Sequence, residues 1–311
     1  MAAYQELYRS GKLGERIDAA VSLLESCSVC PRSCGVNRLA GDVGKCCTPR
    51  EAMVSSYGPH FGEEAPLVGR HGSGTIFFTN CNLKCLFCQN YSISQLGEGQ
   101  KVSEEELSYI MLSLQAKGCH NINLVSPTHV VPQILEALEL AVESGLHIPL
   151  IYNSGGYDSV ETLRILDGIV DIYMPDMKYD DEETARELSG IENYPEINKT
   201  AIKEMHRQTG DMEINEEGVA QRGLLVRHLI LPQGLAGTKG IVNFLGKEIS
   251  RNTYVNIMAQ YHPCHKAFQI PSLGRRISSA EFREALSLAQ EAGLSRLDKI
   301  HPIEILSIRP E

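Results

Sequence analysis

The segment TIFFTNCNLKCLFC, from Thr75 to Cys88, is an apolar run that leads directly into a cysteine motif. Its first part, Thr75–Thr79, is rich in β-branched and aromatic side chains without polar alternation, which is typical of a strand buried on both faces. The loop that follows contains Cys81, Cys85 and Cys88 with the spacing C-x3-C-x2-C. The segment therefore predicts a buried parallel strand that delivers three thiols to one edge of a sheet.

Short apolar runs with strand character recur along the chain, and amphipathic helical stretches separate them. The predicted strands are Thr75–Thr79, Asn121–Ser126, Ile148–Asn153, Asp171–Met174, Leu224–Leu231 and Tyr254–Gln260. Repeated strand–helix alternation favours a parallel sheet with right-handed crossovers. Because these units are too few to close an eight-stranded barrel, we expect an α/β fold with an open partial (β/α)6 barrel. A doubly wound sheet is the alternative.

Capping signals predict where several helices begin. Capping boxes are expected at Ser103–Glu106 and at Ser278–Glu281, each ahead of apolar residues with helical spacing. Another helix is predicted from Val131 to Val142, and Asp158 is the expected N-cap of the helix after it.

The chain before residue 73 differs in character from the rest. Residues 4–25 have helical periodicity, and a cysteine-rich loop follows from Cys27 to Cys47. Residues 48–74 are rich in Gly and Pro, so we expect an irregular connection there. The resulting prediction is an N-terminal helix with a cysteine-rich, metal-binding extension over residues 1–72, and a partial-barrel domain over residues 73–311.

Composition and charge narrow the class of protein. The 311 residues are 42% hydrophobic and 22% charged, which excludes wholesale disorder. A net charge of −10 argues against a nucleic-acid partner. The N-terminus lacks the pattern of a secretory signal and there is no apolar run of about 18 residues, so we expect a cytoplasmic protein without a membrane partner. Ten cysteines there indicate metal or redox chemistry rather than disulfides.

The spacing of Cys81, Cys85 and Cys88 suits an iron–sulfur centre. Three thiolates on one loop hold three irons of a [4Fe–4S] cubane, and the fourth iron is left open to bind a substrate. An electron-transfer ferredoxin needs a fourth cysteine nearby, whereas the next one here is Cys119. The alternatives are a structural zinc site completed by a distant histidine, or three incidental buried thiols.

The N-terminal cysteines form a second candidate metal site. Cys27, Cys30 and Cys34 have the spacing C-x2-C-x3-C, and Cys46 completes four thiols within twenty residues. Cys47 adjoins Cys46, so we expect one of that pair to be a ligand. Zinc and a second four-iron cluster both fit the pattern, and unliganded buried thiols are the third interpretation.

Polar residues occur at the carboxyl ends of the predicted strands, where parallel α/β folds bind ligands. They are Ser126, Thr128 and His129, then Asn153 and Ser154, then Asp176 and Lys178, then Arg227 and His228, and finally Gln260, Tyr261 and His262. We therefore expect one site at one face of the sheet. Simpler interpretations are a solvated strand end for Asp176 and Lys178, a surface pair for Arg227 and His228, and an exposed first-turn position for His129. His262 could equally be an ordinary loop residue.

The cysteine motif, with Phe87 before its last cysteine, resembles the signature of the radical S-adenosylmethionine (SAM) superfamily. The wider sequence is similar to a subfamily of proteins related to pyruvate formate-lyase activating enzymes. The matching segments are Gly72–Phe78, Cys88–Asn90, Pro127–His129, Asn153–Tyr157, Pro175–Tyr179 and Arg227–Pro232. This resemblance implies a [4Fe–4S] cluster and SAM as cofactors, and reductive cleavage of SAM to methionine and a 5′-deoxyadenosyl radical.

The same resemblance implies roles for individual residues around SAM. It implies that Asp176 helps to hold a monovalent cation, with Asn153, Ser154 and Met174 near it. It implies that Lys178 and Arg227 meet the methionyl carboxylate. It also implies that His262 lies near the ribose and that Phe87 packs against adenine. One departure concerns the SAM amino group, which radical SAM proteins commonly bind with Gly-Gly-Glu after the second strand. Here Val125–His129 takes that place, so Ser126 or Thr128 is the candidate replacement.

The resemblance also implies partners. The radical abstracts hydrogen from a partner, for which a glycyl-radical enzyme is the candidate, and a low-potential reductant such as flavodoxin or ferredoxin supplies the electron. One alternative is a radical SAM enzyme that modifies a small molecule or another macromolecule. Another is a non-enzymatic iron–sulfur or metal-binding electron-transfer protein, against which the missing fourth cysteine and the pair Asp176 and Lys178 both argue.

Overall fold

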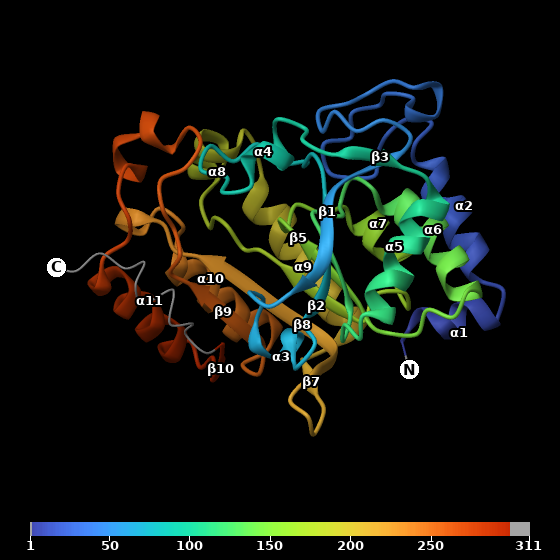
Figure 1. The fold of residues 1–311 in the computed structure, drawn as a ribbon. Helices are drawn as coiled ribbons and strands as arrows, with labels where there is room; N and C mark the ends of the chain where they lie inside the picture. Colours follow the sequence, from blue (N-terminus) through green and yellow to red (C-terminus); the bar gives the residue numbers. More distant parts are fainter. Residues whose placement is uncertain (1, 299–311) are drawn as a thin grey trace.

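Six parallel strands form the centre of the sheet, and they neighbour one another in the order in which the chain makes them. They are β2 (Ser73–Phe78), β4 (Ile122–Val125), β5 (Leu150–Ser154), β6 (Ile172–Pro175), β8 (Ala220–Leu229) and β9 (Tyr254–Met258). Helices connect successive strands (Figure 1). This arrangement confirms the predicted α/β fold, and every predicted strand begins and ends within four residues of an observed one.

The sheet is open at both ends. The computed structural model describes residues 2–298, and within that range the end strands are β3 (Gln100–Val102) and β10 (Arg296–Leu297). A doubly wound sheet reverses its strand order at one point, whereas the described parallel strands run in sequence from β2 to β10. The topology therefore agrees with an open partial barrel.

One strand lies where an irregular connection was expected. Within residues 48–74, β1 (Ala52–His60) runs antiparallel to β2, and β3 pairs with the first three residues of β1. Gly58 and Pro59 hide this strand in the sequence. Pro59 is tolerated because β3 stops short of it, which leaves that part of β1 as an edge. The division at residue 72 separates β1 from its partner β2.

The helices agree well with the capping signals. Their bounds are α1 (Tyr4–Arg9), α2 (Leu13–Ser22), α3 (Ala65–Val68), α4 (Tyr91–Ser94), α5 (Glu104–Ala116), α6 (Val131–Glu143), α7 (Val160–Ile165), α8 (Glu182–Ser189), α9 (Tyr194–Thr209), α10 (Thr238–Phe244) and α11 (Ser279–Glu291). Both predicted capping boxes are present, at the start of α5 and of α11. The expected helix over residues 4–25 is two helices, because Gly11 turns the chain with a φ of 72°.

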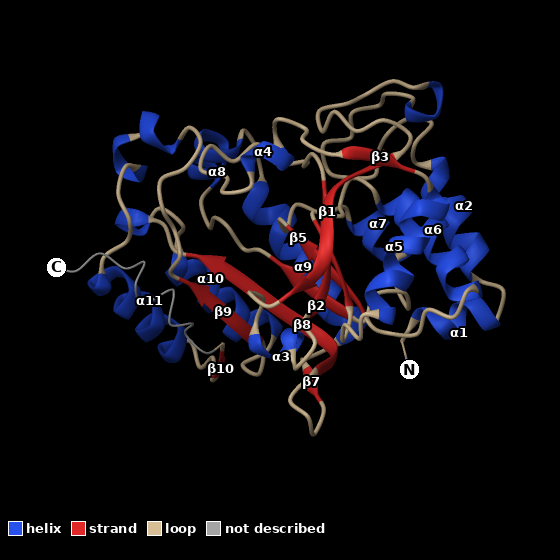
Figure 2. Ribbon diagram, in the orientation of Figure 1, coloured by secondary structure: helices blue, strands red, loops and turns tan. Residues whose placement is uncertain are grey.

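The two faces of the sheet are covered differently. Helices α2, α5, α6 and α7 gather on one side of the strands (Figure 2), where they enclose the larger part of the core. On the other face, Leu67 of α3 packs with Ile151, Met174 and Leu225 in a smaller apolar cluster. Packing on this second face fills the space below the carboxyl ends of the strands and leaves those ends free to form a site.

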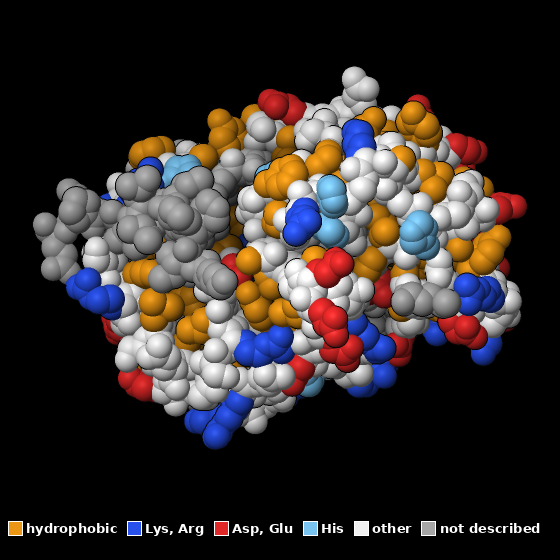
Figure 3. All heavy atoms as spheres, turned by 60° about the horizontal axis from the view of Figure 1, so that its bottom comes forward, with side chains coloured by type: hydrophobic (Ala, Val, Ile, Leu, Met, Phe, Trp, Pro, Cys, Tyr) orange, Lys and Arg blue, Asp and Glu red, His pale blue; other side chains and the backbone are white. Residues whose placement is uncertain are grey.

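Charge is distributed evenly over the face seen in Figure 3, where basic and acidic side chains are interspersed. Among residues 2–298, the helices are all too short or too polar to cross a membrane.

Candidate active site

The loop after β2 brings its three cysteines to the wall of one cavity. Cys81, Cys85 and Cys88 all line this cavity. Three tethers fix the loop: the side-chain amide of Asn82 donates to the carbonyl oxygen of Tyr157 over 2.7 Å, and the backbone of Leu86 bonds to Leu188 and Lys266, each over 2.8 Å. The loop is therefore held from three other parts of the chain.

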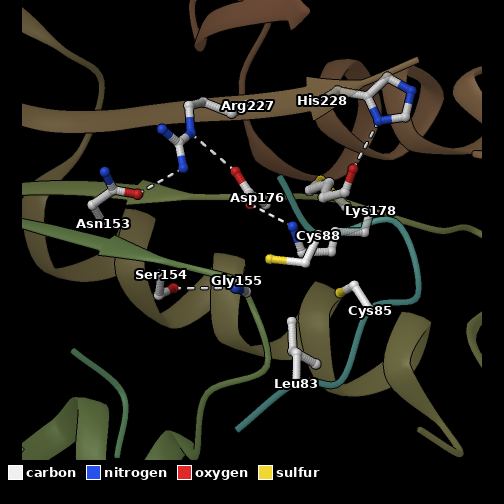
Figure 4. Close-up of polar contacts among 12 residues, drawn as sticks. Leu83, Cys85, Cys88, Asn153, Ser154, Gly155, Asp176, Lys178, Arg227 and His228 are labelled. Atoms are coloured by element: carbon white, nitrogen blue, oxygen red, sulfur yellow. Dashed lines mark hydrogen bonds and ion pairs between the residues drawn. The ribbon is translucent and has the colours of Figure 1, made fainter. Parts of the chain in front are cut away.

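Half of the twelve polar residues expected at the strand ends line the same cavity. They are Ser126, Asn153, Ser154, Asp176, Lys178 and Arg227, and all of these except Ser126 are labelled in Figure 4. They come from the ends of four strands, β4, β5, β6 and β8, and from the residues just beyond them. The structure thus brings together side chains that were grouped from strand periodicity alone.

The Asp176 carboxylate forms ion pairs with two basic side chains. Lys178 Nζ lies 2.6 Å from Asp176 Oδ2, and Arg227 Nε lies 2.9 Å from Oδ1. Arg227 Nη2 also donates to Asn153 Oδ1 over 2.6 Å. All these charged side chains are less than one-fifth exposed, so the interpretations as a solvated strand end and as a surface pair are wrong. His228 is fully buried and bonds to the Met177 carbonyl and the Thr238 hydroxyl.

The three charges keep one another ionised. Burial alone would raise the pKa of Asp176, but Arg227 and Lys178 hold it below its ordinary value. Burial would likewise lower the pKa of Lys178, but the Asp176 carboxylate raises it above its ordinary value. One carboxylate between two cations leaves a net charge of +1 on the wall of the cavity, which favours an anionic group of a ligand.

Two of the thiols receive contacts from hydroxyl groups that the sequence did not reveal. Ser189 at the end of α8 donates to Cys85 Sγ over 3.0 Å, and Ser94 Oγ lies 3.1 Å from Cys88 Sγ. Burial raises the pKa of Cys81 to about 12. A thiol with this pKa becomes a thiolate when a metal binds it, because metal binding displaces the proton.

Three predicted contacts are directed elsewhere. The Phe87 ring is 5% exposed and packs edge-on against Tyr179 and Tyr261, with ring centroids 6.4 and 5.9 Å away, instead of facing the cavity. The Thr128 hydroxyl donates to Asp158 over 2.7 Å. His262 Nδ1 lies 3.2 Å from Gln89 Nε2, outside the lining of the cavity. Phe87 is buried by its contacts with two tyrosine rings, and Thr128 is buried by its hydrogen bond to Asp158.

His129 is also placed differently from the expected exposed first-turn position. It is 1% exposed, and its Nε2 lies 3.0 Å from the carbonyl oxygen of Thr79. Burial lowers its pKa to about 4, so the ring is neutral near pH 7 and its Nε2 donates to that carbonyl.

Asp158 is a buried acceptor rather than a helix cap. Its carboxylate accepts from the hydroxyls of Thr128, Tyr152 and Ser154 over 2.7, 2.9 and 2.6 Å. Ser159 occupies the N-cap position of α7. Because Ser154 lines the cavity and Thr128 lies on the same loop as Ser126, between β4 and α6, Asp158 holds two parts of the cavity wall together.

Comparison with known proteins decides the family. A family model described as the radical SAM superfamily matches residues 75–212. An uncharacterised protein of Methanocaldococcus jannaschii is 33% identical over 298 residues, which cover 93% of this chain and 81% of that protein. The chain belongs to the radical SAM superfamily. A [4Fe–4S] cluster and SAM are the cofactors that membership of this superfamily implies.

Solved structures share the fold of this radical SAM protein. A radical SAM methyltransferase from Sphaerobacter thermophilus matches 76% of this chain and 69% of its own, with 14% identity and a TM-score of 0.51. The FeFe-hydrogenase maturase HydG from Carboxydothermus hydrogenoformans matches 74% of this chain and 55% of its own, with 13% identity and a TM-score of 0.50. At these identities the likeness concerns the fold alone.

Proposed function

We propose that this radical SAM protein holds a [4Fe–4S] cluster through Cys81, Cys85 and Cys88 and cleaves SAM reductively. One electron from a low-potential reductant, such as flavodoxin or ferredoxin, breaks the bond between the sulfonium sulfur and the 5′ carbon. The products are methionine and a 5′-deoxyadenosyl radical, which takes a hydrogen atom from a partner. The observation that supports this function best is that the three thiols and the Asp176–Lys178–Arg227 cluster line one cavity.

The residues present fit both cofactors. Three thiols on one loop suit a cubane with one open iron, where the cluster would supply the electron at SAM. The net positive charge of the Asp176 cluster suits the SAM carboxylate, with Lys178 as its first partner because the ammonium has donors beyond its bond to Asp176. The hydrogen bond between Arg227 and Asn153 holds this group of charged side chains in place.

Ser126 is the better candidate for the SAM amino group. It lines the cavity, whereas the Thr128 hydroxyl is already bonded to Asp158. The φ of Ser126 is 58°, in the left-handed region that favours glycine, at the stretch where the family commonly has Gly-Gly-Glu. Asp176 remains the proposed contact of a monovalent cation, with Asn153 and Ser154 beside it.

A glycyl-radical enzyme is the proposed hydrogen donor, on the strength of the sequence resemblance to pyruvate formate-lyase activating enzymes. The departure from Gly-Gly-Glu at Val125–His129 favours a second candidate, which is a radical SAM enzyme acting on a small molecule or another macromolecule. A non-enzymatic electron carrier has no anionic ligand for the buried side chains of Lys178 and Arg227 to bind beside the thiols.

An anaerobic reaction tests the proposal. The reconstituted protein is mixed with SAM and a strong reductant, and 5′-deoxyadenosine is measured by chromatography. The expected result is 5′-deoxyadenosine and methionine in equal amounts, formed only when the reductant is present. A protein with a full complement of iron and sulfide that leaves SAM intact would contradict it. A candidate glycyl-radical enzyme is then added, and a glycyl radical is sought by electron paramagnetic resonance.

A further inference from the structure

The cysteine-rich N-terminal segment has little regular structure of its own. Between residues 23 and 51, all of which are described, the regular element is the short 3-10 helix η1 (Arg38–Ala40). Segments of this length without secondary structure need another source of order. One source is Arg38, which is 1% exposed and donates to the carbonyl oxygens of Pro49 and His129, each over 2.8 Å at its shortest. The cysteines are the remaining candidates.

Three of the cysteines lie on one closed turn. The Cys27 backbone N–H donates to the Val36 carbonyl over 2.9 Å, and the Gly35 N–H donates back to the Cys27 carbonyl over 3.1 Å. Inside this closure, the Ser33 N–H donates to the Cys30 carbonyl over 3.0 Å. Cys34 lies between Ser33 and Gly35, so the turn holds three thiols in a small volume.

A second limb brings the fourth thiol. The Lys45 N–H points at Cys34 Sγ over 3.4 Å, and a β-carbon at Gly44 would come within 2.9 Å of that sulfur. Gly44 therefore permits a close approach that a larger residue would block. The limb then buries Cys46, which is 6% exposed, and leaves Cys47 exposed. The structure thereby selects Cys46 from the pair.

These thiols are arranged for a positive partner. All ten cysteines of the chain are free, and Cys27 and Cys30 are buried together with Cys46. Cys27, Cys34 and Cys46 all lie close enough to Cys30 to act on it electrostatically. Among residues 2–298 no group of three or more His, Cys, Asp or Glu side chains is placed closely enough to hold a metal ion, so a metal would have to draw the four sulfurs inward as it displaces their protons.

We propose that Cys27, Cys30, Cys34 and Cys46 bind a thiophilic metal centre that supports the loop of the active site. The link is Arg32, whose Nε donates to the carbonyl oxygen of Asn82 over 2.9 Å and whose Nη1 donates to that of Gly190 over 3.2 Å. Asn82 follows Cys81 directly. The centre is a tetrathiolate zinc ion or a second iron–sulfur cluster, since both use this ligand set.

Metal analysis of the full chain tests the site independently of SAM cleavage. The Cys81→Ala/Cys85→Ala/Cys88→Ala variant removes the first site and is purified without oxygen. About one zinc per chain, or iron with equal sulfide, is the expected result, and both identify the centre. Either metal should disappear when Cys27→Ala and Cys30→Ala are added, and should remain with the matched control Cys47→Ala. A metal-free triple variant would overturn the proposal.

A second measurement needs no substitution that could disturb folding. Alkylation of the unaltered protein is followed by mass spectrometry with and without a strong chelator. The four proposed ligands should react at least tenfold more slowly than Cys47 until the chelator is added. Slow labelling that persists after metal analysis shows that all zinc and iron have been removed would indicate burial without metal and would overturn the site.

Hydrogen exchange tests the link to the active-site loop. Replacing Cys27 and Cys30 by Ala should speed exchange of the amides of residues 79–90, because the turn that positions Arg32 is loosened. Arg32→Ala should have the same effect and keep the N-terminal metal. Unchanged exchange in both variants would refute the supporting role.

Discussion

The hydroxyl of Ser189 donates a hydrogen bond to the sulfur of Cys85, with 3.0 Å between Oγ and Sγ. The Tyr179 hydroxyl lies 2.7 Å from the same Ser189 oxygen, so the contact belongs to a short buried chain of polar groups. Hydrogen bonds to ligand sulfurs are one of the means by which proteins set the potential of iron–sulfur clusters. A donor stabilises the reduced cluster more than the oxidised one, because the reduced cluster has more negative charge.

Ser189→Ala should therefore lower the reduction potential of the cluster held by Cys85. A shift of tens of millivolts is expected, since about 59 mV corresponds to a tenfold change in a one-electron equilibrium. The measurement is a redox titration followed by electron paramagnetic resonance. Ser189→Thr keeps a hydroxyl donor, so its reduction potential should stay close to that of the unaltered protein. The matched control is Ser108→Ala, at another buried serine, on α5. A potential equal to that of the unaltered protein would show that the bond has no such role.

Lys178→Ala should weaken SAM binding and leave the iron content intact. A hydrogen bond to a charged group contributes about 1.5–3 kcal/mol, which corresponds to roughly a 10- to 150-fold loss of affinity. Asp176 keeps its bond to Arg227, so the cavity wall should persist. Equilibrium titration of the anaerobic, cluster-loaded variant with SAM measures the effect. The control is Lys199→Ala, which breaks a similar short ion pair with Asp180 outside the cavity; an equal affinity in the two variants would remove Lys178 from the SAM site.

Asp158→Asn should destabilise the protein and weaken SAM binding together. Asn offers one acceptor oxygen and an amide donor to three hydroxyls that now all donate to Asp158, so a loss of about 1–3 kcal/mol in the free energy of unfolding is expected. Denaturant unfolding and SAM titration are the two measurements. The exposed pair of Asp167 and Arg207 provides the control Asp167→Asn. Loss of stability with full SAM affinity would separate Asp158 from the cavity.

The contribution of Asp158 to the stability of the fold should fall as the pH rises. Burial raises its pKa above the ordinary value, and its three hydroxyl partners offset this only in part. The folded protein then holds the proton more tightly than the unfolded chain, so this group favours folding at low pH, and that contribution is lost as the pH rises through the folded pKa. Asp158→Asn should flatten this part of the stability profile. A profile with the same slope in both proteins would contradict the raised pKa.

The sequence predicted the thiol loop and most of the cavity wall because both depend on the ends of parallel strands. Strand ends meet at one edge whatever the details of packing, so Asp176 and Arg227 could be grouped from periodicity. Ser189 could not be found in this way, because it lies at the end of helix α8 and reaches Cys85 through tertiary packing. The packing of Phe87 could not be predicted either, because a place in a motif does not fix the direction of a side chain, and here the ring packs against Tyr179 and Tyr261.

Asp158 and Pro59 show where local rules were overridden. Asp158 has the right position for a helix N-cap. Its carboxylate instead accepts hydrogen bonds from three buried hydroxyls, which stabilise it more than one backbone N–H of the helix would. Pro59 has the appearance of a strand breaker, yet it lies in β1 where the strand has become an edge. In both places the outcome depended on segments distant in the sequence.

Single substitutions test most directly whether Cys81, Cys85 and Cys88 hold the cluster that cleaves SAM. Each of Cys81→Ala, Cys85→Ala and Cys88→Ala is reconstituted without oxygen and assayed for 5′-deoxyadenosine with SAM and a strong reductant. Cys119→Ala, at a buried cysteine outside the cavity, is the control and should keep full activity. We predict that all three variants lose 5′-deoxyadenosine production. Full production by any one of them would contradict the assignment.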